Sequence, residues 1–307
     1  MDSTGGTSRV EVFGDGFLAI DQHNAPGVTI GSLEGTGAVL LGGNTLTVGS
    51  NNLTTTFSGS VTGGGGLTKV GTGTLTLSGS NNYSGATTVN NGTLTIDNNN
   101  TTIQRLPLTS SIAVNSGGTL LLAQSGSAST DRINNNAGVT LAGGGTFKTG
   151  GLSEGTRPTN SSATNGAAGM GALTLQSTSS ISRATIDFTA SPGGGSTLAF
   201  SSLVGGNGAF LDLNNWTGTP FTDNSATSND RLLFANDPGL TAAQLANLRF
   251  FNDSGTFIGP GEIISYGNMF ELVAVPEPST WFAAGLSLLV ITYSQRRRFA
   301  RAIKRAT

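Results

Sequence analysis

The chain contains a single histidine and no cysteine, and this limits the chemistry that its side chains can perform. A Cys-His dyad, a thiolate metal site and a multi-histidine metal site all need residue types that the chain lacks. A Ser-His-Asp triad would have to use His23, which lies in the polar stretch 21–24 shortly before Pro26. No nucleophile elbow is evident in the sequence, so we interpret His23 as an exposed turn residue.

Three further patterns could carry chemistry, and each lacks a required part. Residues 97–100 offer oxygen ligands to calcium, but without the spacing or the terminal Glu of a calcium loop. The glycines at 63–66 are not followed by the Lys-Ser/Thr of a phosphate-binding loop. Paired carboxylates could cleave a polysaccharide, but acids are sparse and none lies two positions from another on a repeat strand. The sequence therefore predicts no cofactor, no metal site, no catalytic residues and no enzymatic activity.

The charges are unevenly distributed along the chain. The formal net charge is −2, but residues 1–278 carry nine Lys or Arg against 17 Asp or Glu, a balance of −8. Residues 279–307 carry six basic residues and no acid, a balance of +6. Phosphate contacts need clustered Lys and Arg, so the acidic body argues against nucleic acid as a partner.

The body of the chain repeats one short pattern. Gly-Thr-Leu occurs at 73–75, 92–94 and 118–120, and Gly-Thr-Phe at 145–147, so the intervals are 19, 26 and 27 residues. Apolar residues alternate with Thr in each unit, which places the two kinds on opposite faces of a strand. Gly and Asn cluster between the units, where they tolerate tight corners. The sequence predicts an all-β solenoid of stacked rungs, with a β-sandwich as the alternative.

Changes in composition divide the chain into three segments. Residues 1–204 are the predicted solenoid repeat region, in which 58–96 is the clearest repeat. Residues 151–170 lose the alternation and are interpreted as a loop or linker. Residues 205–274 form a predicted β-rich capping module, and residues 275–307 a C-terminal tail.

The predicted capping module contains the only convincing short helix of the body. Thr241 is its expected N-cap, and Leu245 and Leu248 lie on one side of it. The module would seal the last open rung, as solenoids need for solubility. A carbohydrate site around Trp216 is an alternative role, but a single Trp belongs more often to a core than to a ligand platform.

One stretch is more specific than the periodicity. Residues 65–79 read Gly-Gly-Leu-Thr-Lys-Val-Gly-Thr-Gly-Thr-Leu-Thr-Leu-Ser-Gly, and residues 81–94 read Asn-Asn-Tyr-Ser-Gly-Ala-Thr-Thr-Val-Asn-Asn-Gly-Thr-Leu. This stretch closely resembles the autotransporter-associated β-strand repeat of bacterial surface and secreted proteins. The resemblance implies a right-handed parallel β-helix. Lys69 and Tyr83 match family positions, and we interpret Tyr83 as a turn-packing side chain and Lys69 as an exposed edge charge.

The tail has the physical features of a membrane anchor. Ser279 to Gln295 predicts an apolar helix of about seventeen residues, at the short limit for spanning a bilayer. Trp281 and Tyr293 lie near its ends, as interface aromatics do, and an Arg cluster beyond it would stay in the cytoplasm. The alternative is a buried core helix, against which three consecutive arginines without an acid nearby argue. The anchor residues are Trp281, Leu286, Leu288, Leu289, Val290, Ile291 and Tyr293, and the basic stop is Arg296, Arg297 and Arg298.

Just before this helix stand Pro276, Glu277 and Pro278. Pro-Glu-Pro, a short membrane helix and a terminal Arg cluster, in this order, resemble the PEP-CTERM sorting signal. The resemblance implies export by a Gram-negative bacterium, a transient inner-membrane intermediate, and an exosortase that recognises and cleaves the tail. It further implies delivery to the cell surface or to the extracellular polysaccharide matrix, often in biofilm-forming species. These residues are features of a substrate and not catalytic residues.

Export requires an N-terminal signal, and the start of the chain does not resemble one. Residues 1–6 have neither a charged n-region nor an apolar h-region, and residues 10–20 already have strand character. We expect a fragment of a longer β-helix, with a misplaced start codon as the alternative.

Two functions remain open from the sequence. The first is a structural or adhesive surface protein that acts as a spacer. The second is a carbohydrate-binding or polysaccharide-cleaving protein that uses a groove along the helix. A groove of this kind should align aromatic residues on successive rungs, and the repeats contain few, chiefly Phe57, Tyr83 and Phe147. The sequence therefore favours the spacer.

Overall fold

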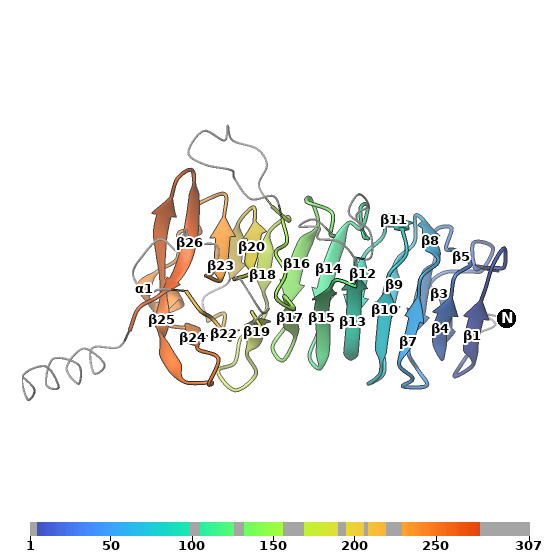
Figure 1. The fold of residues 1–307 in the computed structure, drawn as a ribbon, viewed down its shortest axis with the longest axis horizontal. Coiled ribbons are helices and arrows are strands. Elements are labelled where there is room, and N and C mark those ends of the chain that lie inside the picture. Colours follow the sequence, from blue (N-terminus) through green and yellow to red (C-terminus); the bar gives the residue numbers. More distant parts are fainter. Residues whose placement is uncertain are drawn as a thin grey trace, which may run out of the picture.

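The protein is a rod of stacked β-strand coils (Figure 1). This computed structural model describes residues 5–98, 105–125, 132–155, 169–189, 195–205, 208–218 and 229–276. Successive strands of a face pair in parallel, one coil above another, and only the C-terminal end contains antiparallel pairs between named strands. The predicted all-β solenoid is thus confirmed, and the arrangement does not fit a β-sandwich of antiparallel sheets.

Three faces surround the core, and the chain visits them in the same order in every coil of its first half. Face I is formed by β1 (Arg9–Val12), β4 (Ser32–Gly35), β7 (Thr55–Phe57), β10 (Thr74–Leu77), β13 (Gly92–Asp97), β15 (Gly118–Ala123), β17 (Thr146–Lys148), β19 (Ala184–Asp187), β22 (Leu211–Asn214) and β24 (Leu248–Phe251). Face II begins with β2 (Phe17–Ala19), β5 (Ala38–Leu40), β8 (Ser60–Gly63) and β11 (Asn81–Tyr83). Face III consists of β3 (Gly27–Ile30), β6 (Thr45–Val48), β9 (Leu67–Lys69), β12 (Thr87–Val89), β14 (Ser111–Val114), β16 (Gly138–Leu141), β18 (Leu173–Leu175) and β21 (Leu203–Gly205).

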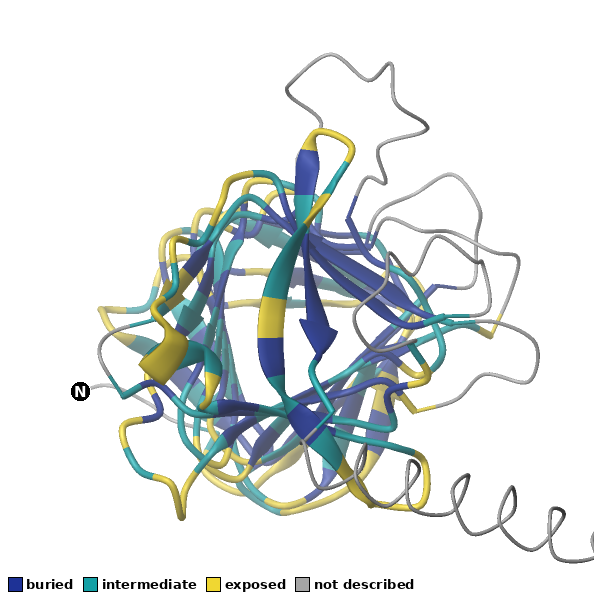
Figure 2. Ribbon diagram, turned by 90° about the vertical axis from the view of Figure 1, so that its left-hand side faces the viewer, coloured by how far each residue is buried: buried dark blue, intermediate teal, exposed yellow. Residues whose placement is uncertain are grey.

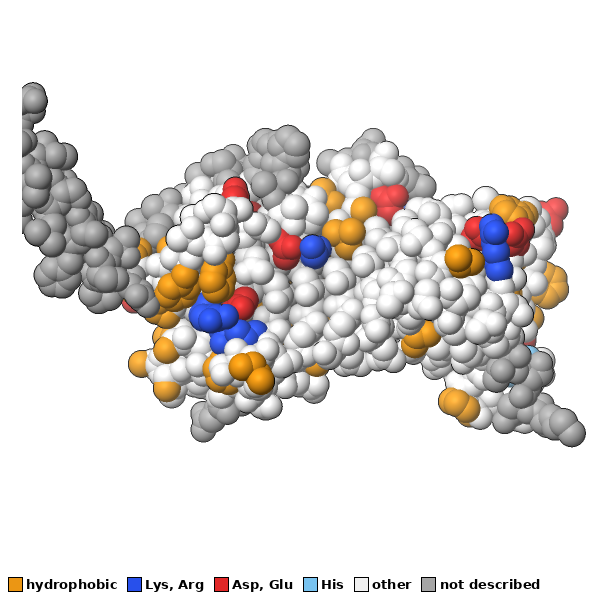
Figure 3. All heavy atoms as spheres, turned by 90° about the horizontal axis from the view of Figure 1, so that it is seen from below, with side chains coloured by type: hydrophobic (Ala, Val, Ile, Leu, Met, Phe, Trp, Pro, Cys, Tyr) orange, Lys and Arg blue, Asp and Glu red, His pale blue; other side chains and the backbone are white. Residues whose placement is uncertain are grey.

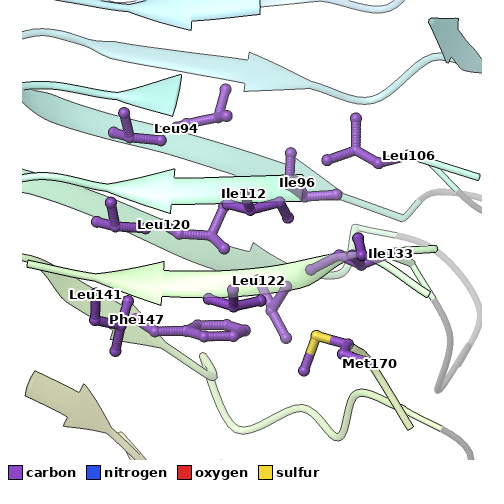
Figure 4. Packing of buried hydrophobic residues seen from close by; sticks show 14 of the residues in the cluster. Leu94, Ile96, Leu106, Ile112, Leu120, Leu122, Ile133, Leu141, Phe147 and Met170 are labelled. Atoms are coloured by element: carbon purple, nitrogen blue, oxygen red, sulfur yellow. The ribbon is translucent and has the colours of Figure 1, made fainter. Parts of the chain in front are cut away.

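Alternation within each strand produces the core. Thr74 pairs with Thr93 and Leu75 with Leu94, so residues of the same kind lie above one another. The inward column of face I continues with Leu120 and Phe147, all fully buried (Figure 4). The outward side of the same strands carries a column of threonines: Thr74, Thr93, Thr119, Thr146 and Thr185. Stacked β-branched side chains support one another across neighbouring strands, which explains the repeated Thr-x-Thr pattern.

Face II is less regular in the second half of the rod. Beyond β11 it is carried by single bridges, Leu106 with Ile133, Glu154 with Leu198 and Met170 with Phe200. It then becomes regular again in β20 (Thr197–Phe200) and β23 (Arg231–Phe234), which pair in parallel. The predicted loop at 151–170 therefore has both of its ends seated in the β-coil, and residues 156–168 lie outside the described residues.

The C-terminal end of the rod is covered by antiparallel strands. β25 (Phe257–Tyr266) and β26 (Met269–Ala274) form a hairpin that lies across the end of the core (Figure 2). Thr241 is the N-cap of the short helix α1 (Ala242–Leu245), as predicted, and it forms a capping box with Gln244. The helix is shorter than predicted, because Leu248 already begins strand β24. The predicted boundary at residue 204 does not interrupt the parallel ladder, because β22 and β24 continue face I beyond it.

The predicted sorting and anchor residues lie almost entirely outside the described part of the chain. Pro276 is described and half-buried, and the description ends there. Glu277, Pro278, the anchor residues from Trp281 to Tyr293 and the basic stop at 296–298 are not among the described residues. None of the helices in the described ranges is long and apolar enough to cross a bilayer.

Glycines allow the corner between faces I and II to stack closely. A Cβ atom added to Gly59 would lie 1.8 Å from the carbonyl oxygen of Gly37, and one added to Gly79 would lie 1.7 Å from that of Gly59. Neither Gly59 nor Gly79 has a positive φ. The lack of space between successive coils, rather than a special backbone conformation, therefore requires glycine at these positions.

We predict that Gly59→Ala lowers the free energy of unfolding by about 1–3 kcal/mol or more, because the added methyl group overpacks the corner. Gly43→Ala is the matched control, since a Cβ there meets no atom within 4 Å and the residue has no positive φ. Chemical unfolding followed by far-UV circular dichroism measures both variants. Equal stabilities would contradict the close stacking of this corner.

Candidate functional site

The outward side of face I changes its chemistry in the last coils. The threonine column that ends at Thr185 is continued by Asp212 and Arg249. The neighbouring column runs from Lys148 through Asp187 to Asn214. Figure 3 shows charged side chains toward the two ends of the rod and a further acid–base pair between them, on an otherwise mostly uncharged surface. The last coils, toward the C-terminal end, are thus the part of this face whose outward side chains differ most in type.

Asp187 lies at the centre of the first cluster. Its carboxylate is 3.1 Å from Nζ of Lys148. It also accepts hydrogen bonds from Nδ2 of Asn215 at 2.6 Å and from the hydroxyl of Thr189 at 2.7 Å. Burial alone would raise the pKa of Asp187, but these hydrogen bonds and the Lys148 charge hold it below the usual value. The carboxylate is therefore ionised and fixed in position at neutral pH.

Asp212 is bound by two arginines. Arg183 donates to Oδ1, and Arg249 donates to both carboxylate oxygens, at 2.9 and 2.8 Å. Burial lowers the pKa of Arg183, whereas the hydrogen bond with Asp212 raises that of Arg249. Each guanidinium also lies over an aromatic ring, Arg183 over Phe210 and Arg249 over Phe251. The two arginines of the cluster are therefore held in place both by charge and by stacking.

A groove of about 450 Å³ lies beside this cluster. Its walls come from the end of β22, the end of β24 and the turn that follows β24, and the lining residues are Asp212, Asn214, Asn215, Phe251, Asn252, Asp253, Ser254 and Gly255. The turn is built by Asn252, whose Oδ1 accepts from the backbone N–H of Ser254 and of Thr256. Amides, carboxylates and a hydroxyl around an aromatic ring could bind a polyhydroxylated ligand.

Two other residues singled out in the sequence do not contribute to this groove. Trp216 is only 2% exposed, packs edge-on against Phe250 at 4.7 Å, and donates from Nε1 to the carbonyl of Asp230. The alternative prediction of a carbohydrate site at Trp216 is therefore wrong, and the interpretation of Trp216 as a core residue is confirmed. His23 lies in the turn between β2 and β3 and is half-buried, so it is less exposed than expected. Among the described residues, no group of three His, Cys, Asp or Glu could hold a metal ion.

Sequence reasoning missed the buried charges on the side of face II. Arg132 lies 3.6 Å from Glu154, and Arg231 lies 3.3 Å from Glu271, with all four side chains buried. One carboxylate oxygen of Glu154 also accepts hydrogen bonds from the backbone N–H groups of Arg132 and Ile133. It takes the place of the carbonyl group that a neighbouring strand would offer. These charged residues stand singly in stretches without a repeat, so their spacing in the sequence does not indicate that they pair. Only the fold brings the partners together.

Lys69 and Tyr83 lie in the most regular part of the rod. Lys69 pairs with Val48 and Val89 in an inward column and is 1% exposed, so its interpretation as an exposed edge charge is wrong. Its position two residues after the inward Leu67 explains this orientation. Its Nζ reaches the corner and donates to the carbonyls of Val70, Gly71 and Asn91.

Tyr83 is fully buried, as its interpretation as a packing residue requires. Its hydroxyl is 2.7 Å from the hydroxyl of Thr87, which in turn lies 2.9 Å from that of Thr109 on the next coil. Burial raises the pKa of Tyr83. The aromatic residue thus fills the corner between faces II and III and links two coils through hydroxyl groups.

Comparison with protein families identifies this part of the chain. Residues 67–96 match the family model of the passenger-associated transport repeat. The match covers β9 to β13, which is more than one full coil, and confirms the resemblance to the autotransporter-associated β-strand repeat. The repeat indicates an exported surface protein that is similar to an autotransporter passenger domain. No curated protein and no solved structure matches the chain.

Lys69 predicts a pH dependence of stability. Burial lowers its pKa to about 8, whereas an unfolded lysine titrates near 10.4. Between these values the unfolded chain binds more protons, so stability should rise with pH, by at most about 1.4 kcal/mol per pH unit. Lys69→Met should abolish this rise, and Lys148→Met, which removes a half-exposed lysine, should retain it. Chemical unfolding between about pH 8 and 9.5 tests both variants, because above that range the buried Tyr83, whose pKa is raised, contributes with the opposite sign. An unchanged profile in Lys69→Met would contradict the assignment.

Proposed function

We propose that this protein is an exported cell-surface or extracellular-matrix protein whose solenoid acts as a structural or adhesive spacer. The observation that carries the proposal is the match of residues 67–96 to a transport repeat within an uninterrupted parallel ladder. Stacked coils with a continuous core make a rod that holds its ends apart. The proposal assigns no catalytic activity to the chain.

The proposal includes the winding of the rod and its route to the surface. Successive strands of one face are joined by crossover connections, which are almost always right-handed, so we infer a right-handed helix. The Pro276-Glu277-Pro278 motif, the apolar run and the Arg cluster support sorting by an exosortase through an inner-membrane intermediate in a Gram-negative bacterium. The tail would be removed when the protein reaches the surface or the extracellular polysaccharide.

Processing of the tail can be tested on the native protein. Surface and membrane fractions are separated, and the C-terminal peptides of each are identified by mass spectrometry. We expect the surface form to end upstream of the basic stop at 296–298, with the intact C-terminus only in the membrane fraction. An intact Arg-rich end on mature surface protein would reject the sorting proposal and leave a simple membrane anchor.

Carbohydrate binding is the second candidate function, and the groove on the terminal coils favours it. Asn214 and Asp253 offer an amide and a carboxylate, and Phe251 offers part of a ring, within one hollow of about 450 Å³. Pockets of this size and mixed chemistry hold small ligands. The ligand that we propose is a segment of neutral extracellular polysaccharide.

Variants in the groove test this candidate. The probes are immobilised neutral polysaccharides, namely dextran, cellulose and xylan. Asn214→Ala should weaken retention by a factor of about two to ten, since a lost hydrogen bond contributes about 0.5–1.5 kcal/mol. Thr93→Ala removes an outward side chain of the same face far from the groove and should bind normally. Equal retention of the two variants, or no retention of the unmodified protein, would exclude the groove as a binding site for these polymers.

A further inference from the structure

The groove beside Asp212 contains polar side chains that are available to a ligand. The side chains of Asn214 and Asp253 line it and form no hydrogen bond or ion pair with any other described residue. Asn215, by contrast, is bonded to Asp187, and Asp212 is bonded to two arginines. An amide and a carboxylate can both form hydrogen bonds with hydroxyl groups. Asn214 and Asp253 are therefore the residues of the groove that are suited to bind a ligand, whereas the bonded residues hold its shape.

Two threonines continue the outward column of Asp212 along the axis of the rod. Asp212 pairs with Thr185 and Thr185 with Thr146, so their side chains follow one another at the strand spacing of about 4.8 Å. Both threonines are half-buried, and within the described part of the chain their hydroxyl groups form no hydrogen bond. The hydroxyls of Thr87 and Thr109, which lie inside the rod, are bonded to each other. Unused polar groups thus extend from the groove over two further coils.

The charges on this part of face I and in the turn after β24 cancel one another. The positive side chains are Lys148, Arg183 and Arg249, and the negative ones are Asp187, Asp212 and Asp253. All except Asp253 are already bound in ion pairs with one another. A polymer with a high charge of either sign would therefore meet as much repulsion as attraction here. Electrostatic complementarity favours a ligand without net charge.

We infer that the ligand of the groove is an extended, neutral β-1,4-linked glycan chain that lies along the axis of the rod, from the groove to Thr146. The inference rests on carbohydrate binding by the groove, the second candidate function. The sugar residues of such a chain repeat at a distance close to the strand spacing, so each residue meets one coil. The sugar hydroxyls bond to Asn214, Asp253 and the hydroxyls of Thr185 and Thr146. The apolar ring faces pack against the threonine methyl groups and the ring of Phe251.

The straight line of contacts selects a stiff chain. A β-1,4-linked glycan is already extended in solution, so contact with successive coils costs it little conformational entropy. An α-1,6-linked glycan such as dextran has an additional rotatable bond at every linkage, and it must lose this freedom at each coil that it contacts. The groove and the two threonines together should therefore bind cellulose and xylan in preference to dextran.

Soluble oligosaccharides of defined length test the linkage and the orientation of the chain. Titration calorimetry on the full chain, kept in mild detergent, compares cellobiose, cellotetraose and cellohexaose. Affinity should rise from cellobiose to cellotetraose, which is long enough to extend from the groove to Thr146, and should change little for cellohexaose. Isomaltotetraose, an α-1,6-linked chain of the same length, should bind about fivefold more weakly than cellotetraose or less well still. Equal affinities for the two tetrasaccharides would reject a β-1,4-linked ligand.

Substitutions separate this inference from the candidate function on which it rests. Thr146→Ala combined with Thr185→Ala should weaken cellotetraose binding about fivefold or more, because two hydrogen bonds are lost, and should affect cellobiose much less. Thr140→Ala combined with Thr174→Ala, an outward pair on face III, is the matched control and should bind both sugars normally. Circular dichroism verifies that each variant is folded.

Two results would overturn the axial chain and leave carbohydrate binding by the groove intact. They are equal affinities of the unmodified protein for cellobiose and cellotetraose, and an unchanged affinity for cellotetraose in the Thr146→Ala, Thr185→Ala variant. Absence of binding to all of these sugars would overturn both the inference and the candidate function.

Discussion

The whole structure depends on the parallel, in-register pairing of each coil with the next. Main-chain hydrogen bonds run between coils, so a residue in a regular strand has a defined neighbour in the coil above and in the coil below. Each inward side chain must pack against the corresponding side chain of the preceding coil, and each corner must leave room for the backbone of that coil. This single constraint explains the Leu94, Leu120 and Phe147 column inside, the threonine column outside, and the glycines at 37, 59 and 79, where two backbones approach too closely for a side chain.

Residues that depart from the pattern are held by specific contacts. Lys69 occupies a position of the core, but its long side chain carries the ammonium group to the carbonyls of the corner. Glu154 occupies face II where the regular ladder is absent, and its carboxylate accepts the backbone hydrogen bonds that a strand carbonyl would have received. Polar groups in the interior of this fold are thus bonded to backbone groups, either at a corner, as for Lys69, or where the ladder is absent, as for Glu154.

Much of the fold follows from the sequence because the signal is periodic. Alternation of Thr with Leu or Ile at 74–77 and 93–96 predicts both the strands and their faces, and Thr241 predicts the helix cap. The number of faces does not follow, because strands of three or four residues on faces II and III resemble turns in the sequence. The groove was also not foreseen, since Asp212, Phe251 and Asn252 come from elements that only the stacking brings together. Trp216 and Lys69 show the limits of single-residue reasoning, because burial depends on the register of the neighbouring coils.

The direction of the hydrogen bonds has a mechanical consequence. They lie along the length of the rod, so a force that pulls the two ends apart is borne by every coil boundary, and the weakest boundary breaks first while the others hold. Each coil that peels away lengthens the molecule greatly, because a strand spacing of about 4.8 Å is replaced by about 20 residues of extended chain at roughly 3.3 Å each. A rod of this design would therefore yield stepwise under tension, absorbing work at each step while the remaining coils stay intact.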